Sequence, residues 1–304
     1  MLQTRMLGQR PQPVDEHGAR GDTARIYHEI RQSLRVSGVN LNFRTWAAFS
    51  QFFPAMWAAM QPIAVSRAFE SASDDLRAAA ADLLLALPAL RIGTAVGESQ
   101  RYQIDGALTL YHYVNPKLLL FTVLVTRGLR GKRAASGQPR ATDLAARVPF
   151  GAPRSMAAME MVDDNPTDKR LRRLFSDIKK TLQLSSINSD YRTLALWPDY
   201  LEPAWGALKP VVQTEAYRDA AVALGGHARA AADRFPTPQG FDLRRLGALG
   251  EKTQALSDLT DGFERLLPPL ILNIGLFGRD WWPDGRLRSS PFPLTEAPRM
   301  EERR

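Results

Sequence analysis

The sequence contains no cysteine, and its four histidines are scattered, so several kinds of chemistry are excluded at the outset. Without cysteine the chain forms no disulfide, holds no thiolate-bound metal and has no thiol nucleophile. No two histidines stand at the spacing of a metal site, and glycine-rich phosphate loops and the GxSxG and HExxH motifs are missing. We therefore expect no metal and no cofactor, and any catalysis is expected to depend on carboxylates.

Long apolar runs and a signal peptide are also missing. The longest apolar runs, at 118–125 and 266–272, are much shorter than the roughly 20 residues that cross a bilayer. The N-terminal sequence MLQTRMLGQRPQP has no apolar core of the kind that a signal peptide needs. We expect a cytoplasmic protein with no transmembrane segment and no membrane partner.

Positive charges exceed negative charges by 8, which raises the question of a nucleic-acid partner. The most basic tract contains glycine and proline but no aromatic residues, and its cations are Arg127, Arg130, Lys132, Arg133 and Arg140. A solvated linker explains this pattern better than a nucleic-acid site, so no nucleic-acid partner is expected. A positive field also concentrates small anions, which suits an enzyme that acts on acids.

The chain contains an internal duplication. Residues 182–210 align without a gap on residues 34–62 when they are shifted by 148 positions. Identical positions include Leu34/Leu182, Ser37/Ser185, Asn40/Asn188, Arg44/Arg192, Thr45/Thr193, Ala47/Ala195, Trp57/Trp205, Ala59/Ala207 and Pro62/Pro210. The copies differ at Leu41-Asn42, which is replaced by Ser189-Asp190 in the second copy. Only the second copy therefore carries an acid.

Apolar residues recur at helical spacing, and no segment alternates as a strand does, so the predicted fold class is all-α. The duplication predicts two pseudo-symmetric helical repeats that pack as an intramolecular pseudo-dimer. We assign residues 1–125 to the first repeat, 126–164 to a linker and 165–304 to the second repeat.

Local signals place the individual helices. Helices are expected over 22–35, 73–88, 104–125, 165–182, 214–235 and 259–277, with a further helix from 242. Asp22, Ser73, Asn165 and Thr214 are the predicted caps. The aromatic segment 46–57 is predicted to be a helix that Pro54 interrupts, and the tail from residue 280 to be irregular. Proline at 116 is expected to break the helix 104–125 and to free carbonyl groups near position 112.

Two polar residues in apolar surroundings are the candidate functional groups. Asn115 precedes the expected break in its helix, where it serves either as a local cap or as an amide pointed into a cavity. Asp190 lies in an otherwise uncharged stretch, where it is either an N-cap or a catalytic base. A carboxylate that is withdrawn from water has a raised pKa and becomes a better general base. The residue types alone leave both pairs of alternatives open.

Four short motifs, in order along nearly the whole chain, carry a resemblance to a known family. They are IRQSLRV near the N-terminus, Asn115-Pro116-Lys117 followed by LLL, Ser189-Asp190-Tyr191 with Trp197-Pro198 downstream, and the closing SPFPL. The sequence resembles the group I 2-haloacid dehalogenases, whose chains are internally duplicated as well. The DxDx(T/V) motif of the unrelated HAD-type dehalogenases is absent.

The resemblance implies an all-helical enzyme with its active site between the two repeats. It implies that Asp190 takes a proton from water, that Asn115 helps to hold this water, and that the water displaces halide from C2 with inversion and without a covalent intermediate. Holding water in line behind the carbon–halogen bond supplies much of the acceleration in such a reaction. Substrate and water are the expected partners, and a homodimer is expected from the family.

The resemblance also assigns the substrate pocket. Ser189, with nearby backbone amides, is expected to bind the substrate carboxylate, and the remaining pocket residues carried over are Asn188, Leu41, Asn40, Phe263, Leu266, Leu267 and Leu270. Asn188 beside the reacting carbon is expected to exclude one enantiomer, which favours D-2-haloacids such as D-2-chloropropionate. Gly38 and Leu41 stand where related sequences often have bulky aromatics. The alternatives are a dehalogenase that accepts both enantiomers and a non-catalytic helical binding module.

Overall fold

The structure is a computed structural model that describes residues 11–93, 96–131 and 144–294. The helices in this part of the chain are α1 (Gly21–Leu34), α2 (Leu41–Trp46), α3 (Phe52–Ala64), α4 (Arg67–Leu85), α5 (Glu98–Leu129), α7 (Lys169–Leu182), α8 (Ser189–Leu194), α9 (Pro198–Val212), α10 (Glu215–Ala232), α11 (Leu243–Ala248), α12 (Thr253–Arg279) and α13 (Asp284–Arg288). An isolated bridge joins Ser66 to Arg147, and the described residues form no strand. The predicted all-α class is confirmed.

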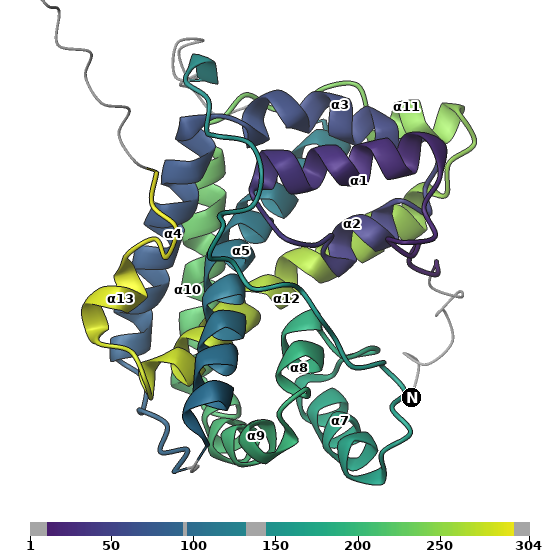
Figure 1. Cartoon of the computed structure of the whole chain (residues 1–304). Coiled ribbons are helices and arrows are strands. Elements are labelled where there is room, and N and C mark those ends of the chain that lie inside the picture. Colours follow the sequence, from purple (N-terminus) through teal and green to yellow (C-terminus); the bar gives the residue numbers. More distant parts are fainter. Residues whose placement is uncertain (1–10, 94–95, 132–143, 295–304) are drawn as a thin grey trace, which may run out of the picture.

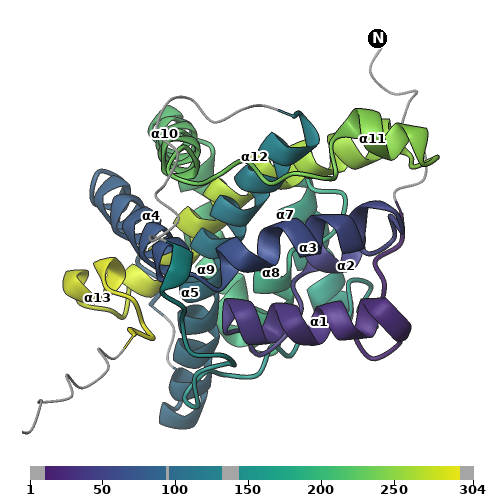
Figure 2. The same ribbon diagram turned by 90° about the horizontal axis from the view of Figure 1, so that it is seen from above.

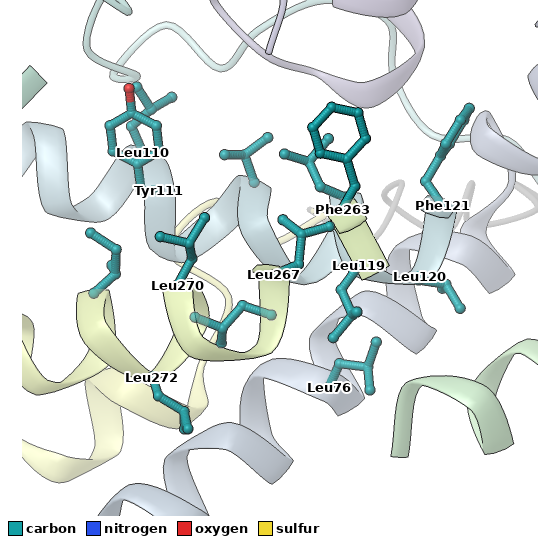
Figure 3. Close-up of a cluster of buried hydrophobic side chains, with 14 of the residues drawn as sticks. Leu76, Leu110, Tyr111, Leu119, Leu120, Phe121, Phe263, Leu267, Leu270 and Leu272 are labelled. Atoms are coloured by element: carbon teal, nitrogen blue, oxygen red, sulfur yellow. The ribbon is translucent and has the colours of Figure 1, made fainter. Parts of the chain in front are cut away.

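Two long helices, α5 and α12, pack along each other through the centre of the molecule (Figures 1 and 2). In Figure 1, α1, α2 and α3 lie in the upper right of the molecule, and α7, α8 and α9 lie in its lower part. Residues 110–126 of α5 are all buried. By length and composition α5 is able to cross a membrane, but nearly all of its most apolar stretch is buried in the fold. Figure 3 shows the apolar side chains that α5 and α12 bring together with Leu76 of α4.

The shift of 148 residues that relates the two sequence copies also relates their local structure. Helices α1 and α7 end at Arg35 and Gln183, which are the only non-glycine residues with positive φ among the described residues. Several hydrogen bonds recur at the same shift: Trp57 Nε1 to Glu29 and Trp205 Nε1 to Asp177, Val39 N to Glu16 and Ile187 N to Asp164, and Phe69 N to Ser66 and Tyr217 N to Thr214. Both copies therefore form similar local structure over the segments compared.

Several predicted helix starts are wrong, because polar residues that resemble caps lie inside or before the helices. Helix α4 begins at Arg67, where the Ser66 side chain accepts from Phe69 N, and Ser73 lies inside the helix with its hydroxyl bonded to the Phe69 carbonyl. The α7 cap is Asp168, which accepts from two first-turn amides, and not the predicted Asn165. Asp168 caps the helix in place of Asn165 because its carboxylate lies within reach of the Arg170 and Leu171 amides.

Other helix bounds divide between confirmed and corrected predictions. Thr214 caps α10 as expected, and α11 begins at the expected place, with Asp242 as its cap. Helix α1 begins at Gly21 after Arg20, without a side-chain cap from Asp22. The aromatic segment forms two helices, α2 and α3, separated at residues 47–51, and Pro54 lies in the first turn of α3, where proline is tolerated. The tail is not wholly irregular, because it contains α13.

The basic tract begins inside the core helix. Helix α5 continues to Leu129, past the residue 125 at which we end the first repeat. Arg127 and Arg130 form ion pairs with Asp233 and Asp261, at 3.3 and 2.7 Å. These two cations are thus bound to acids of the same chain. Lys132, Arg133 and Arg140 lie outside the described residues.

We expected Pro116 to break α5, and this prediction is wrong. Another side chain replaces the hydrogen-bond donor that proline lacks. The helix is continuous through Pro116, whose missing N–H would have bonded the His112 carbonyl. Arg77 of α4, which is fully buried, donates from Nε to the His112 carbonyl at 3.0 Å and from Nη2 to the Tyr113 carbonyl at 3.2 Å. The expectation of freed carbonyls near position 112 is therefore correct, and Arg77 satisfies them.

We predict that the contribution of Arg77 to stability depends on Pro116. Replacing Arg77 with Met leaves buried carbonyls without partners, and we expect the free energy of unfolding to fall by about 2 kcal/mol. A Pro116→Ala substitution restores a backbone donor, so Arg77→Met is expected to cost less in that background. Urea unfolding of the four proteins of this double-mutant cycle measures the coupling. Strictly additive effects would contradict the exchange of donors.

Candidate active site

Two six-residue helices, α2 and α8, are each preceded by an asparagine whose side chain makes no capping hydrogen bond. Asn40 and Asn188 are the N-cap residues, but neither side chain bonds to the first turn of its helix. The Oδ1 atoms of both residues are buried and have no hydrogen-bond partner among the described residues. The two side chains line the same small cavity. Buried polar atoms are normally paired, so these two amides mark the cavity as a place where a ligand or water binds.

The second residue of α8, Asp190, meets the first-repeat helix α5. Asn115 of α5 donates from Nδ2 to Asp190 Oδ2 at 2.8 Å, and both side chains are buried. Asp190 therefore does not cap α8, and Asn115 does not cap α5. Of the alternatives that the sequence left open, the local-cap interpretations of these two residues are wrong. The structure instead joins the two polar groups across the two repeats.

Burial raises the pKa of Asp190 to about 7. Removal of the carboxylate from water is the larger effect, and the hydrogen bond from Asn115 opposes it by stabilising the charged form. No lysine, arginine or histidine is among the described residues that line the small cavity, so no adjacent cation holds the pKa down. A carboxylate with a pKa near neutrality is well matched to general-base chemistry at physiological pH.

The small cavity has a volume of about 20 Å³. A space of roughly 10–15 Å³ is enough to hold one water molecule, so the cavity accommodates a water and little else. It is lined by Asn40, Leu41, Asn42, Asn115, Leu118, Asn188, Ser189, Asp190, Phe263, Leu266, Leu267 and Leu270. The structure thus gathers all ten site residues predicted from the sequence around one cavity, and adds Asn42 and Leu118.

Most residues that line the small cavity form pairs across the two repeats, and Phe263 and Leu266 are the exceptions. A shift of 148 relates residues 40–42 to residues 188–190, and a shift of 152, which aligns Pro116 with Pro268, relates Asn115 to Leu267 and Leu118 to Leu270. One member of each differing pair carries the chemistry, as Asp190 does opposite Asn42. The cavity therefore lies where equivalent parts of the two copies meet, and its chemistry is one-sided.

The sequence contained signals for the two residues that were missed. Asn42 is the residue that aligns with Asp190 in the other copy, and Leu118 follows Asn115 by about one helical turn. Asn42 of α2 donates from Nδ2 to Thr122 Oγ1 of α5 at 3.4 Å, so its side chain amide contacts α5. Tyr111, one turn before Asn115, bonds to Thr193 Oγ1 at 2.7 Å and further ties α5 to α8.

A second, larger cavity of about 470 Å³ adjoins the small one. The two cavities share five lining residues, which are Leu41, Asn188, Phe263, Leu266 and Leu270. The other walls of the large cavity come from the 181–186 segment at the end of α7, from α12, and from Val212 and Tyr217 of α9 and α10. These shared side chains form the partition between a water-sized space and a space large enough for a small organic molecule.

Gly38 does not line either cavity, so the pocket role implied for this position by the resemblance does not apply to it. A Cβ atom built on Gly38 would lie 2.9 Å from Met159 Cβ, and thus the methionine of the linker fills the space. Leu41, the other position at which related sequences often have an aromatic residue, lines both cavities. Only Leu41 is placed to affect pocket size directly.

The fold and the site define a class of all-helical proteins in which two repeats hold one buried carboxylate and its amide partner over a water-sized cavity. Comparison with known proteins identifies the family. The family model described as halocarboxylic acid dehydrogenase DehI matches residues 37–191, which include Asn115 and Asp190. The chain belongs to this family.

Named relatives and solved structures agree with this assignment. An (R)-2-haloacid dehalogenase of Pseudomonas putida is 34% identical over 279 residues, covering 87% of this chain and 91% of the relative. A configuration-inverting 2-haloacid dehalogenase of Pseudomonas sp. (strain 113) is 32% identical over 208 residues, covering 66% and 67%. A solved D-2-haloacid dehalogenase mutant in complex with D-2-CPA has a TM-score of 0.81 and 30% identity, and the match covers 89% of this chain and 95% of that protein.

We predict that Asp190 destabilises the folded protein as the pH rises. Its pKa is about 7 when folded and near 3.8 when unfolded, so the stability associated with the protonated group is complete below about pH 4 and is lost as the pH approaches 7. Asp190→Asn cannot titrate and is expected to be more stable than the wild type at pH 8, by roughly 4 kcal/mol, and equally stable near pH 4. Melting temperatures measured between pH 4 and pH 8 test this. A difference that does not vary with pH would contradict the raised pKa.

Proposed function

We propose that the protein hydrolyses the D enantiomers of short 2-haloalkanoic acids to L-2-hydroxy acids and halide, through direct attack of water on C2. The observation that carries this proposal is the buried Asp190–Asn115 pair beside a water-sized cavity in a chain of the DehI family. The names of the relatives support the substrate class, the preferred enantiomer and the inversion of configuration. The reaction needs only a base, a water molecule and a site for the acid.

In the proposed reaction, Asp190 is the general base. Its carboxylate takes a proton from water while the water oxygen forms a bond to C2, and the carbon–halogen bond breaks with its electron pair leaving on the halide. Attack from the side opposite the halogen inverts C2 and converts a D-haloacid into an L-hydroxy acid. Asn115, which holds Asp190 at 2.8 Å, helps to fix the water in line, and such positioning supplies a large part of the rate acceleration.

The unpartnered amide oxygens complete the water site in this proposal. A water that gives one proton to Asp190 has a second proton that needs an acceptor. The buried Oδ1 atoms of Asn40 and Asn188 are available acceptors in the lining of the same cavity. With both protons engaged, a lone pair of the water oxygen is left to face C2.

The substrate carboxylate needs a place away from Asp190, because two like charges repel each other strongly in a buried site. Ser189 lines the small cavity, and the first N–H groups of α8 have no acceptor within their own helix. We assign carboxylate binding to the Ser189 hydroxyl and these amides. Phe263, Leu267 and Leu270 are left to contact the alkyl group and the halogen, which suits their apolar side chains.

We predict that Asp190→Asn abolishes halide release while the fold is retained. Loss of a general base typically lowers the rate by about 10²–10⁴-fold, and we expect at least that loss for D-2-chloropropionate. Halide release by the wild type from D- and L-2-chloropropionate is the reference measurement. No release from any 2-haloacid by the wild type would refute the proposed function, and a fully active Asp190→Asn would refute the assignment of the base.

Isotope labelling tests the absence of a covalent intermediate in the same experiment. Under single-turnover conditions in ¹⁸O-water, we expect the label in the hydroxyl group of lactate and none in the protein. Label that appears in the Asp190 carboxylate would show that this residue attacks carbon itself.

We predict that Asn188 sets the preference for the D enantiomer. Its side chain lines both cavities and is buried beside the proposed position of C2, where it excludes one placement of the alkyl group. Asn188→Ala is expected to lower the D-to-L ratio of kcat/KM for 2-chloropropionate by about tenfold, since removing steric exclusion in a pocket changes relative rates by this order. Asn40→Ala, which truncates the equivalent residue of the first copy, is the matched comparison. An unchanged D-to-L ratio in Asn188→Ala would assign enantiomer selection to other residues.

A further inference from the structure

The large cavity borders the small cavity on the side formed by the second sequence copy. Its walls are residues 181–186, one face of α12, and Val212 and Tyr217 of α9 and α10. The shifts of 148 and 152 residues map Gln183, Arg265 and Pro269 of this wall onto Arg35, Tyr113 and Lys117. The comparison therefore shows what occupies the corresponding place in the first repeat.

A buried charge cluster occupies that place. Lys117 Nζ donates to Glu70 Oε2 at 2.7 Å, to Tyr113 OH at 2.6 Å and to the Leu34 carbonyl at 3.0 Å. Arg35 donates to the same Glu70 carboxylate at 3.4 Å. These side chains are all less than a tenth exposed, so Arg35, Tyr113 and Lys117 are buried in the cluster, whereas the residues aligned with them border a cavity.

The linker and the C-terminal tail complete this closure. The Ser37 hydroxyl donates to the Ala157 carbonyl at 2.7 Å, and Met159 fills the space next to Gly38, which aligns with the cavity residue Ser186. In the tail, the Phe292 ring packs edge-on against Tyr113 at 5.1 Å. Residues 181–186 instead border the large cavity, and so the small cavity can be reached from the second-repeat side.

Arg265 is the only cation that lines the large cavity among the described residues, and it forms no hydrogen bond or ion pair with any of them. The only acid in that described lining, Asp258, accepts a hydrogen bond from Gln254. The described lining of the small cavity contains no cation. Arg265 is exposed, so its guanidinium is free to bind a carboxylate that enters the cavity, although the charge of Asp258 lies in the same lining.

We propose that the large cavity is an antechamber in which Arg265 binds the carboxylate of the incoming 2-haloacid before the molecule passes into the small cavity. The inference rests on the proposed function. It assigns a binding site for small carboxylate anions outside the catalytic cavity, and it makes the approach to Asp190 one-sided. The partition, which is formed by Leu41, Asn188, Phe263, Leu266 and Leu270, must move for the substrate to pass, because the small cavity holds only a water-sized volume.

The first test removes the charge. Arg265→Gln is expected to lower kcat/KM for D-2-chloropropionate about fivefold at low ionic strength through KM, with kcat within twofold of the wild type, because a charge at the rim of a site mainly affects capture. The variant is also expected to lose most of the dependence of kcat/KM on salt. Arg172→Gln on α7, an exposed arginine outside both cavities, is the matched control for net charge. Equal effects of the two substitutions would overturn the role of Arg265.

The second test blocks the space. Ser186→Trp places a bulky ring in the large cavity, at the position that aligns with Gly38 of the first repeat. We expect kcat/KM for D-2-bromohexanoate to fall more than about tenfold. Ser176→Trp, at an exposed position of α7, adds the same ring outside the cavity and is expected to leave this value within twofold. Circular dichroism and melting temperature establish that both variants are folded.

The outcomes separate this inference from the proposed function. A wild type that releases no halide from any 2-haloacid refutes the function and with it the antechamber. An active wild type whose kinetics survive both Arg265→Gln and Ser186→Trp refutes the antechamber alone, and places the approach to Asp190 elsewhere.

Discussion

The hydrogen bond between Asn115 and Asp190 is the constraint on which the remaining structure depends, because it joins two parts of the chain that are distant in sequence and both side chains are buried. An isolated buried carboxylate is costly, and a single amide donor offsets only part of that cost. The Asn115 amide must therefore be held at a fixed position relative to Asp190. Arg77 fixes the backbone of the same helix by bonding to the carbonyls that Pro116 leaves free, and Tyr111 ties the preceding turn to α8. These hydrogen bonds fix the position of α5 relative to α8, the short helix that carries Asp190.

The duplicated scaffold serves two unlike purposes in its two halves. Both copies build a short helix that starts at an asparagine, and both starts line one cavity. In the first repeat, the adjoining space is sealed by Glu70, Lys117 and the chain segments that cover them. A buried ion pair of this kind adds little net stability compared with apolar packing, but it specifies one arrangement. In the second repeat the same space is open, so the symmetry that doubles the scaffold is broken where substrate must pass.

The site was easier to predict from the sequence than the helix ends were. The family motifs indicated Asp190, Asn115 and their neighbours, and the alignment of the two copies singled out Asp190 because only one copy carries an acid there. Helix caps such as Ser66 and Asp168 were missed because the choice among nearby polar residues depends on backbone conformation, which a sequence does not display. Arg77 was not predictable for a different reason. Its partners are carbonyl groups of a helix that is distant in sequence, and only packing brings them together.

Asp190 and its anionic substrate impose opposite demands on charge. A cation inside the small cavity would attract the substrate carboxylate, but it would also lower the pKa of Asp190 and weaken it as a base. The described lining of that cavity contains no cation, and burial raises the pKa of Asp190 to about 7. Arg265 stands in the adjoining large cavity instead. In the proposed reaction, attraction of the substrate and activation of water are compatible because the positive charge and the carboxylate line different cavities, separated by Asn188 and four apolar side chains.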